Sequence, residues 1–322
     1  MNESTKFVEY TIPREDISYC VEFCNSETSS QLLAVGTESK VSIYQLKFKE
    51  EDEDVEDFEF QQLTDFQNGC RVTAMSWSPD TSLFSLPKVI RLAVAGSDRR
   101  IRIFSTDLKG DGTVQLLEGH TDFVNSVTFD PDSGTQLAST GDDRWCRIWG
   151  QDGNQQLAFP LGSPGMTVCW HRDEPMKVMV ALKTGTIKIF SLTGQQQLMS
   201  FETGSVPLME ADWSLGNKGL LIGAVTIQEW VMFDVSVSSQ PVERRQIHVE
   251  GCRHFRWARC HDSLAATVGR PGRQIKVFNT KTQQTPLTIS QPIAYTISWH
   301  QKLPVLAAGG DQKVHIYMIE SI

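Results

Sequence analysis

The chain repeats one short pattern seven times, and this repetition limits its fold more than any other feature. An aromatic residue closes an alternating apolar and polar segment, as in AMSWSPD, SVTFDPD and TISWHQK. These aromatic residues are Phe23, Trp77, Phe129, Trp170, Trp213, Trp257 and Trp299. A second aromatic residue closes segments such as IRIF, CRIW and IKIF. Short alternating segments between turn residues are typical of β-strands, so each repeat is a small all-β unit.

The spacing of the repeats indicates which all-β fold they form. Successive first aromatic residues are separated by 54, 52, 41, 43, 44 and 42 positions. A period of about 40–45 residues is that of a four-stranded propeller blade. We therefore expect residues 1–322 to form a single seven-bladed β-propeller. In each blade, the first aromatic residue ends strand a at the axis and the second ends strand c, with strand d outermost.

The two ends of the chain predict how the ring closes. Only five residues follow Tyr317, the second aromatic residue of the last repeat, so blade seven lacks its own strand d. The segment from Phe7 to Ile12 (FVEYTI) precedes the first repeat and has no blade of its own. We expect it to pair with strand c of blade seven, because an open propeller would leave an exposed sheet edge.

Two insertions lengthen the early repeats. The first is an acidic loop at about 47–59, and the second is an apolar loop at about 80–88 containing Leu83, Phe84 and Leu86. In an up-and-down blade the a–b and c–d loops leave from the same end, so both insertions should share one face. We expect the acidic run to be a solvated, flexible loop, with a ligand for a basic partner as the alternative. Leu83, Phe84 and Leu86 are candidate partner contacts, with packing against their own blade as the alternative.

Charge and cysteine usage exclude several classes of function. The net charge is −9, and eight acidic residues lie between Glu50 and Glu59, so the remaining chain is nearly neutral. Direct nucleic-acid binding through a broad basic surface is therefore not expected. The N-terminus has no secretory pattern, and the longest apolar tract is too interrupted for membrane insertion. Seven cysteines without a C-x-x-C pair indicate a reduced, intracellular protein.

One polar set has a clear geometric logic: His120, Ser139, Asp143 and Trp149. We expect the imidazole to bridge the hydroxyl and the carboxylate and thereby tie a loop to the blade. The same residue types would suit a Ser-His-Asp catalytic set, but no nucleophile elbow surrounds Ser139. The prediction is a structural role and no enzymatic activity.

A metal or cofactor is also not expected. The segment GCRHFRWARCH contains Cys252, His254, Cys260 and His261, which are zinc-ligand types. These residues straddle a predicted strand, whereas structural zinc sites use paired ligands from loops at short spacings. No Walker A or dinucleotide-binding glycine pattern occurs.

The Gly119-His120 pair with Asp143 and Trp149 resembles a WD40 repeat. The ordered segments RVTAMSWSP, LEGHTDFVNSVTFDP, DDRWCRIW and SPGMTVCWH resemble the WD-repeat nucleoporins of about thirty-seven kilodaltons from the nuclear pore outer ring. This resemblance implies a non-enzymatic scaffold subunit of the Y-shaped complex that supports pore assembly and the transport of protein and mRNA. It implies docking on the large outer-ring nucleoporin of about one hundred and sixty kilodaltons and contact with other subunits of that complex. It also implies a nuclear envelope location and, in mitosis, a kinetochore location with a role in cell division.

Two other functions fit a propeller of this kind. A WD40 substrate receptor of a ubiquitin ligase often carries an Arg two residues after a Trp-Asp pair at the end of strand c, whereas Trp149 is followed by Gly150. A peptide-reading propeller or propeller enzyme would need convergent groups at the axis, and no motif indicates them. The sequence gives no signal of homo-oligomerisation.

Overall fold

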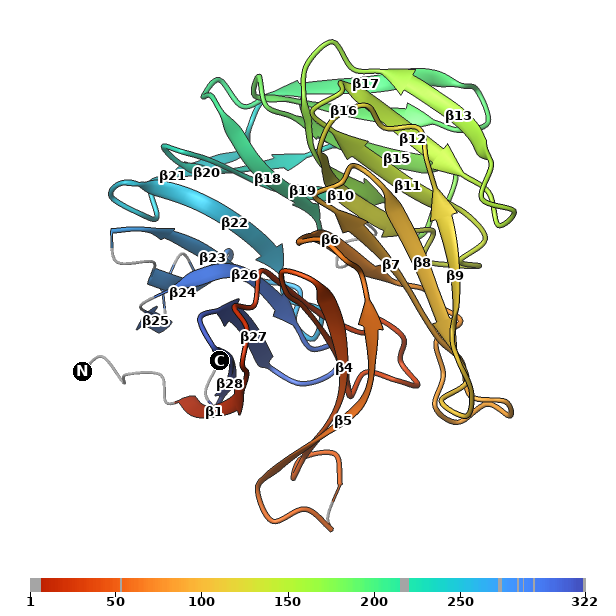
Figure 1. The fold of residues 1–322 in the computed structure, drawn as a ribbon. Coiled ribbons are helices and arrows are strands. Elements are labelled where there is room, and N and C mark those ends of the chain that lie inside the picture. Colours follow the sequence, from red (N-terminus) through yellow and green to blue (C-terminus); the bar gives the residue numbers. More distant parts are fainter. Residues whose placement is uncertain are drawn as a thin grey trace, which may run out of the picture.

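The computed structural model describes residues 7–320 except 53, 215–219, 272, 273, 283, 286 and 292. Within these residues the strands form seven antiparallel sheets of four strands each, arranged around a central axis (Figure 1). The first strand of each sheet contacts the first strand of the next, and the last sheet contacts the first. The predicted seven-bladed β-propeller is confirmed.

The four strands of each blade follow one another from the axis outward. The innermost strands are β2 (Cys20–Phe23), β6 (Val72–Trp77), β10 (Val124–Phe129), β14 (Gly165–Trp170), β18 (Leu208–Trp213), β22 (Gly251–Trp257) and β26 (Ala294–Trp299). The second strands are β3 (Leu32–Gly36), β7 (Ile90–Gly96), β11 (Leu137–Gly141), β15 (Lys177–Leu182), β19 (Leu221–Thr226), β23 (Leu264–Arg270) and β27 (Val305–Gly310). These second strands are buried along most of their length, which explains their small and aliphatic residues.

The outer two strands complete the blades. The third strands are β4 (Lys40–Phe48), β8 (Ile101–Thr106), β12 (Trp145–Trp149), β16 (Thr186–Ser191), β20 (Trp230–Asp234), β24 (Gln274–Asn279) and β28 (Lys313–Ile319). The outermost strands are β5 (Phe58–Gln67), β9 (Thr113–Leu117), β13 (Gln155–Pro160), β17 (Gln196–Glu202), β21 (Glu243–Arg245) and β25 (Leu287–Ser290). The seventh blade takes its outermost strand from the start of the chain, namely β1 (Phe7–Pro13).

The closing strand pairs in the register expected of an outer strand. Strand β1 runs antiparallel to β28, from Phe7 opposite Ile319 to Pro13 opposite Lys313. Ile12 is fully buried in the cluster between blades seven and one. Figure 1 shows β1 and β28 side by side near the marked chain ends. The prediction that Phe7 to Ile12 closes the ring is confirmed.

Aromatic rings pack at the seam between blades one and seven. Tyr10 of β1 stacks on Phe58 of β5 with ring centroids 4.7 Å apart, and Phe58 in turn contacts Phe48. The imidazole of His300 meets the Phe48 ring edge-on, with centroids 5.8 Å apart. Burial of these rings adds to the strand pairing that joins the first and last blades.

Hydrogen bonds between neighbouring inner strands join the blades around the axis. The Ser298 hydroxyl accepts from the Phe23 backbone N–H at 2.9 Å, and the Ser76 hydroxyl accepts from the Phe129 N–H at 3.0 Å. The repeated tryptophan donates to the preceding blade, as Trp77 Nε1 does to the Glu22 carbonyl at 2.9 Å. The aromatic residues that mark the repeats, among them Phe23, Trp77 and Phe129, thus bond one blade to the previous one.

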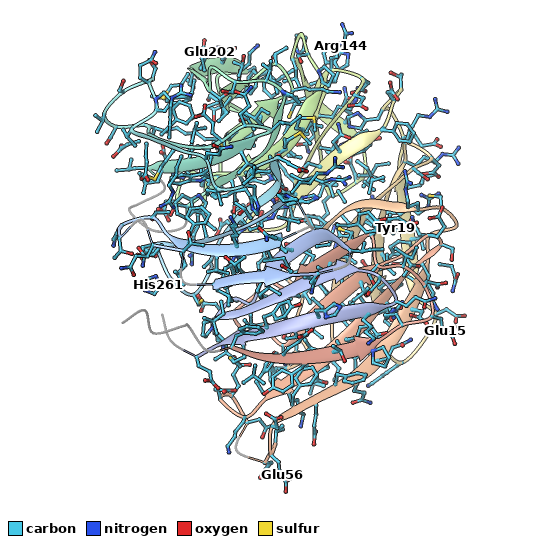
Figure 2. All side chains as sticks on the ribbon, turned by 90° about the vertical axis from the view of Figure 1, so that its left-hand side faces the viewer. Glu15, Tyr19, Glu56, Arg144, Glu202 and His261 are labelled. Carbon is cyan, nitrogen blue, oxygen red and sulfur yellow. The ribbon has the colours of Figure 1, made fainter. Side chains whose placement is uncertain are left out.

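The propeller has two distinct faces. The insertion face carries the a–b and c–d loops, among them residues 49–57 and 78–89, and the opposite face carries the b–c and d–a loops. In Figure 2, His261 of an a–b loop and Tyr19 of a d–a loop lie on opposite sides of the molecule. The prediction that both insertions share one face agrees with this arrangement.

Candidate functional site

The His120 set is assembled as a chain of hydrogen bonds on the opposite face. His120 lies in the d–a loop before β10, and its Nδ1 is 2.8 Å from Asp143 Oδ2 while its Nε2 is 2.7 Å from Ser139 Oγ. The Trp149 indole N–H donates to the same hydroxyl oxygen at 2.8 Å. All four predicted residues are therefore brought together, and they tie the d–a loop to β11 and β12.

The Asp143 carboxylate fixes the direction of the hydrogen bonds in this set. Burial alone would raise the pKa of Asp143, but hydrogen bonds from His120 and two backbone N–H groups lower it below its ordinary value. An ionised carboxylate only accepts, so Nδ1 of His120 donates to it. With the hydrogen on Nδ1, the Nε2 atom of His120 accepts a hydrogen bond from the Ser139 hydroxyl. The Ser139 oxygen in turn accepts a hydrogen bond from the Trp149 indole N–H.

The geometry of the His120 set does not suit catalysis. Ser139 is 0% exposed, and its hydroxyl is already engaged by His120 and Trp149. A nucleophile needs access to substrate and a nearby site for a developing oxyanion. The burial and the hydrogen bonds of these side chains are those that the predicted structural role requires.

Blade six contains a partial copy of this set that the sequence pattern did not reveal. His248 Nε2 lies 2.9 Å from Thr267 Oγ1, but its Nδ1 has no partner among the described residues. Burial and the nearby Lys276 lower the pKa of His248 to about 4. The only signal in the sequence was a histidine in the d–a loop, because the residues around it differ from those around His120.

The four zinc-type residues do not form one site. Cys252 and His254 lie within β22, whereas Cys260 and His261 follow its far end. His254 Nδ1 instead lies 3.2 Å from the Glu210 carboxylate. The described part of the chain contains no group of three or more His, Cys, Asp or Glu side chains arranged to hold a metal.

The apolar insertion divides into an anchored base and an exposed tip. Leu83 is half-buried against the core of blades one and two, and its backbone N–H donates to Ser29 Oγ at 3.2 Å. Phe84 and Leu86 are 75% and 91% exposed. Leu83 therefore packs against its own protein, whereas Phe84 and Leu86 present large apolar surfaces to solvent.

The acidic insertion is a shorter loop than expected and contains one buried apolar side chain. Strands β4 and β5 extend into the predicted range and leave residues 49–57 as the loop, which lies at the lower end of the molecule with Glu56 near its tip (Figure 2). Val55 is 2% exposed, and Glu51 Oε2 lies 3.8 Å from His300 Nε2 in blade seven. Most of its carboxylates are solvated as expected, and the buried Val55 side chain packs the loop against the propeller.

The axis of the propeller contains a channel with a wide mouth at each end. A cavity of about 480 Å³ opens on the insertion face between a–b loops, and a second one of about 480 Å³ opens on the opposite face. A narrower cavity of about 100 Å³ lies between these two and shares lining residues with both. Carboxylates and guanidinium groups line this channel, so it is a polar passage.

The channel wall contains charged residues that the sequence pattern did not lead us to expect. Arg256 forms an ion pair with Glu210, and Arg259 Nη2 lies 3.8 Å from Asp212. The two arginines lower the pKa of Glu22, yet burial outweighs them and raises it to about 7. Glu22, Asp212 and Arg256 each stand directly before the strand-a aromatic residue, where other repeats have Ser, Thr or Cys. These charged residues, at a position that is small and uncharged in the other repeats, were the sequence signal for a charged channel wall.

The described segments include no helix long and apolar enough to cross a membrane.

Comparison with known proteins places the chain in a family. A model described as "WD domain, G-beta repeat" matches residues 60–105 and 111–150, each match running from an outer strand through three strands of the next blade. Nucleoporin Nup37 of Homo sapiens is 40% identical over 323 residues, covering 99% of both chains. Nucleoporin Nup37 of Mus musculus and of Drosophila melanogaster are 39% and 31% identical over 99% and 97% of both chains. With this similarity along its whole length, the chain is a WD-repeat propeller that belongs to the Nup37 family of nucleoporins.

Proposed function

We propose that the chain is a non-enzymatic scaffold subunit of the Y-shaped outer-ring complex of the nuclear pore. Its location is then the nuclear envelope, with a kinetochore location in mitosis and a role in cell division. Its role is to support pore assembly and the transport of protein and mRNA. The full-length similarity to Nucleoporin Nup37 supports the nucleoporin part of this proposal.

The observation that carries the docking part is the exposed tip of the apolar insertion. Phe84 and Leu86 are held out by a loop whose base is anchored through Leu83. Exposed apolar clusters on a soluble protein commonly mark interaction sites. We assign this tip to contact with the large outer-ring nucleoporin of about one hundred and sixty kilodaltons. The buried Ser139 supports a role without catalysis.

Affinity purification from nuclear envelopes, with Phe84→Asp as the variant, tests this proposal. The wild-type chain should recover outer-ring nucleoporins, and Phe84→Asp should recover far less because it removes an apolar anchor. The matched control is Val249→Asp, since Val249 is 77% exposed in a d–a loop of the opposite face. Recovery of cullin adaptors without outer-ring nucleoporins would instead identify a ubiquitin-ligase substrate receptor.

A further inference from the structure

The channel mouth on the insertion face is acidic. Four carboxylates line it, namely Glu27, Asp132, Asp173 and Asp212, against the two guanidinium groups of Arg172 and Arg259. Asp212 and Arg259 lie close enough to pair, at 3.8 Å. The side chains of Glu27, Asp132 and Asp173 have no hydrogen-bond or ion-pair partner within the described residues. Three unpaired carboxylates therefore face one unpaired guanidinium at this mouth.

The two ends of the channel differ in charge. The mouth on the opposite face is lined by Glu22 and Glu210 together with Arg71, Arg253 and Arg256. Arginines outnumber carboxylates there, whereas carboxylates outnumber arginines on the insertion face. A cationic group is therefore attracted to the insertion face in particular, and a nucleic-acid phosphate is repelled from it.

The exposed apolar tip and the acidic mouth are connected through one loop. Pro79, at the start of the 78–89 loop, lines the mouth itself. The same loop is bonded to the loop that carries Glu27, through Leu83 N–H and Ser29 Oγ at 3.2 Å. Phe84 and Leu86 thus belong to a loop that begins at the acidic cavity, and the acidic 49–57 loop lies on the same face.

We infer that the insertion face binds a protein segment that carries lysine or arginine next to large apolar side chains. The apolar residues cover Phe84 and Leu86, while a basic side chain enters the mouth and pairs with Asp132 and Asp173. This inference rests on the proposed docking function and specifies the chemistry of the partner segment. Burial of the apolar side chains contributes to the affinity, and the ionic contacts add specificity and salt dependence.

The double variant Asp132→Lys with Asp173→Lys tests the inference. Both side chains are exposed and unpaired, so their reversal should leave the melting temperature unchanged. The control is Glu250→Lys, an exposed carboxylate in a d–a loop of the opposite face. Binding of each purified chain to outer-ring complex depleted of this subunit is measured at about 0.05 M and about 0.3 M salt.

The wild-type chain and Glu250→Lys should bind alike, and both should weaken as salt rises. The double variant should bind at least about tenfold more weakly at low salt and respond less to salt. Equal binding of the double variant and the wild type, with the same salt response, would overturn the inference and leave the docking function intact. A wild-type chain that does not bind the depleted complex would instead contradict the docking function itself.

Discussion

At the scale of single residues, the buried hydrogen bonds of the His120 set lead to a prediction about stability. The Ser139 hydroxyl accepts a hydrogen bond from the Trp149 indole N–H and forms another with His120, and all three side chains are buried. Removing a shared hydroxyl leaves two buried polar groups without a partner. Leaving a buried polar group unpaired lowers the free energy of unfolding by more than an average hydrogen bond raises it.

We therefore predict that Ser139→Ala lowers the free energy of unfolding by about 1–3 kcal/mol, as measured by urea denaturation. Ser42→Ala is the matched control, because Ser42 is also 0% exposed and its hydroxyl has no partner among the described residues. That control should be neutral or slightly stabilising. Equal effects of the two substitutions would contradict the role assigned to Ser139.

Glu22 leads to a prediction about pH. Burial raises its pKa from 4.5 to about 7 in the folded chain, so the folded state retains a proton that the unfolded state releases. Its contribution to stability is therefore present below pH 4.5 and is lost as pH rises to about 7. Glu22→Gln should remove this loss.

The gain in stability of Glu22→Gln over wild type should grow between pH 4.5 and 7, to about 3 kcal/mol at most. Denaturation curves across this range give the difference directly, and Glu250→Gln serves as an exposed control. A difference that stays constant with pH would show that Glu22 ionises normally in the folded chain.

Residue identity predicted local polar contacts better than it predicted the channel. Ser139 and Trp149 lie on paired strands of one blade, and the adjoining d–a loop and b–c turn bring His120 and Asp143 to them. Glu22, Glu210 and Arg256 come from three different blades, and their proximity depends on how the ring closes. A repeat pattern indicates contacts within one blade directly. Contacts between side chains of different blades can be predicted only when the complete fold is known.

At the scale of elements, the closing strand could be predicted because blade seven lacked one strand and the N-terminus had one extra. The lengths of β4 and β5 could not be predicted in the same way. Their extension depends on pairing from Lys40 with Gln67 to Phe48 with Phe58, and on rings that pack against blade seven. The acidic composition suggested a loop, but contacts between distant segments shortened it.

Deletion of residues 1–12 should give insoluble protein or a strongly lowered melting temperature. The deletion removes most of β1, exposes the edge of β28 and leaves a cavity at Ile12, although residues 1–6 lie outside the described part. Thermal unfolding of the soluble fraction, with its yield, is the measurement. An unchanged melting temperature would mean that β1 does not close the ring.

At the scale of the whole molecule, the two faces are chemically different. The insertion face combines an exposed apolar tip, an acidic channel mouth and an acidic loop, whereas arginines outnumber carboxylates at the opposite mouth. The sequence predicted the positions of the insertions from the order of the strands. It could not predict the acidic mouth, because that mouth is built from single residues on several a–b loops.

The most direct test of this account is lysine crosslinking of the intact outer-ring complex, followed by mass spectrometry. Exposed lysines mark both faces: Lys49, Lys88, Lys109 and Lys302 lie in loops of the insertion face, and Lys183 and Lys313 lie at the opposite face. We predict that crosslinks to the large outer-ring nucleoporin concentrate on the first group and are lost with Phe84→Asp. Crosslinks that concentrate on Lys183 and Lys313 would place the partner on the opposite face and contradict the account.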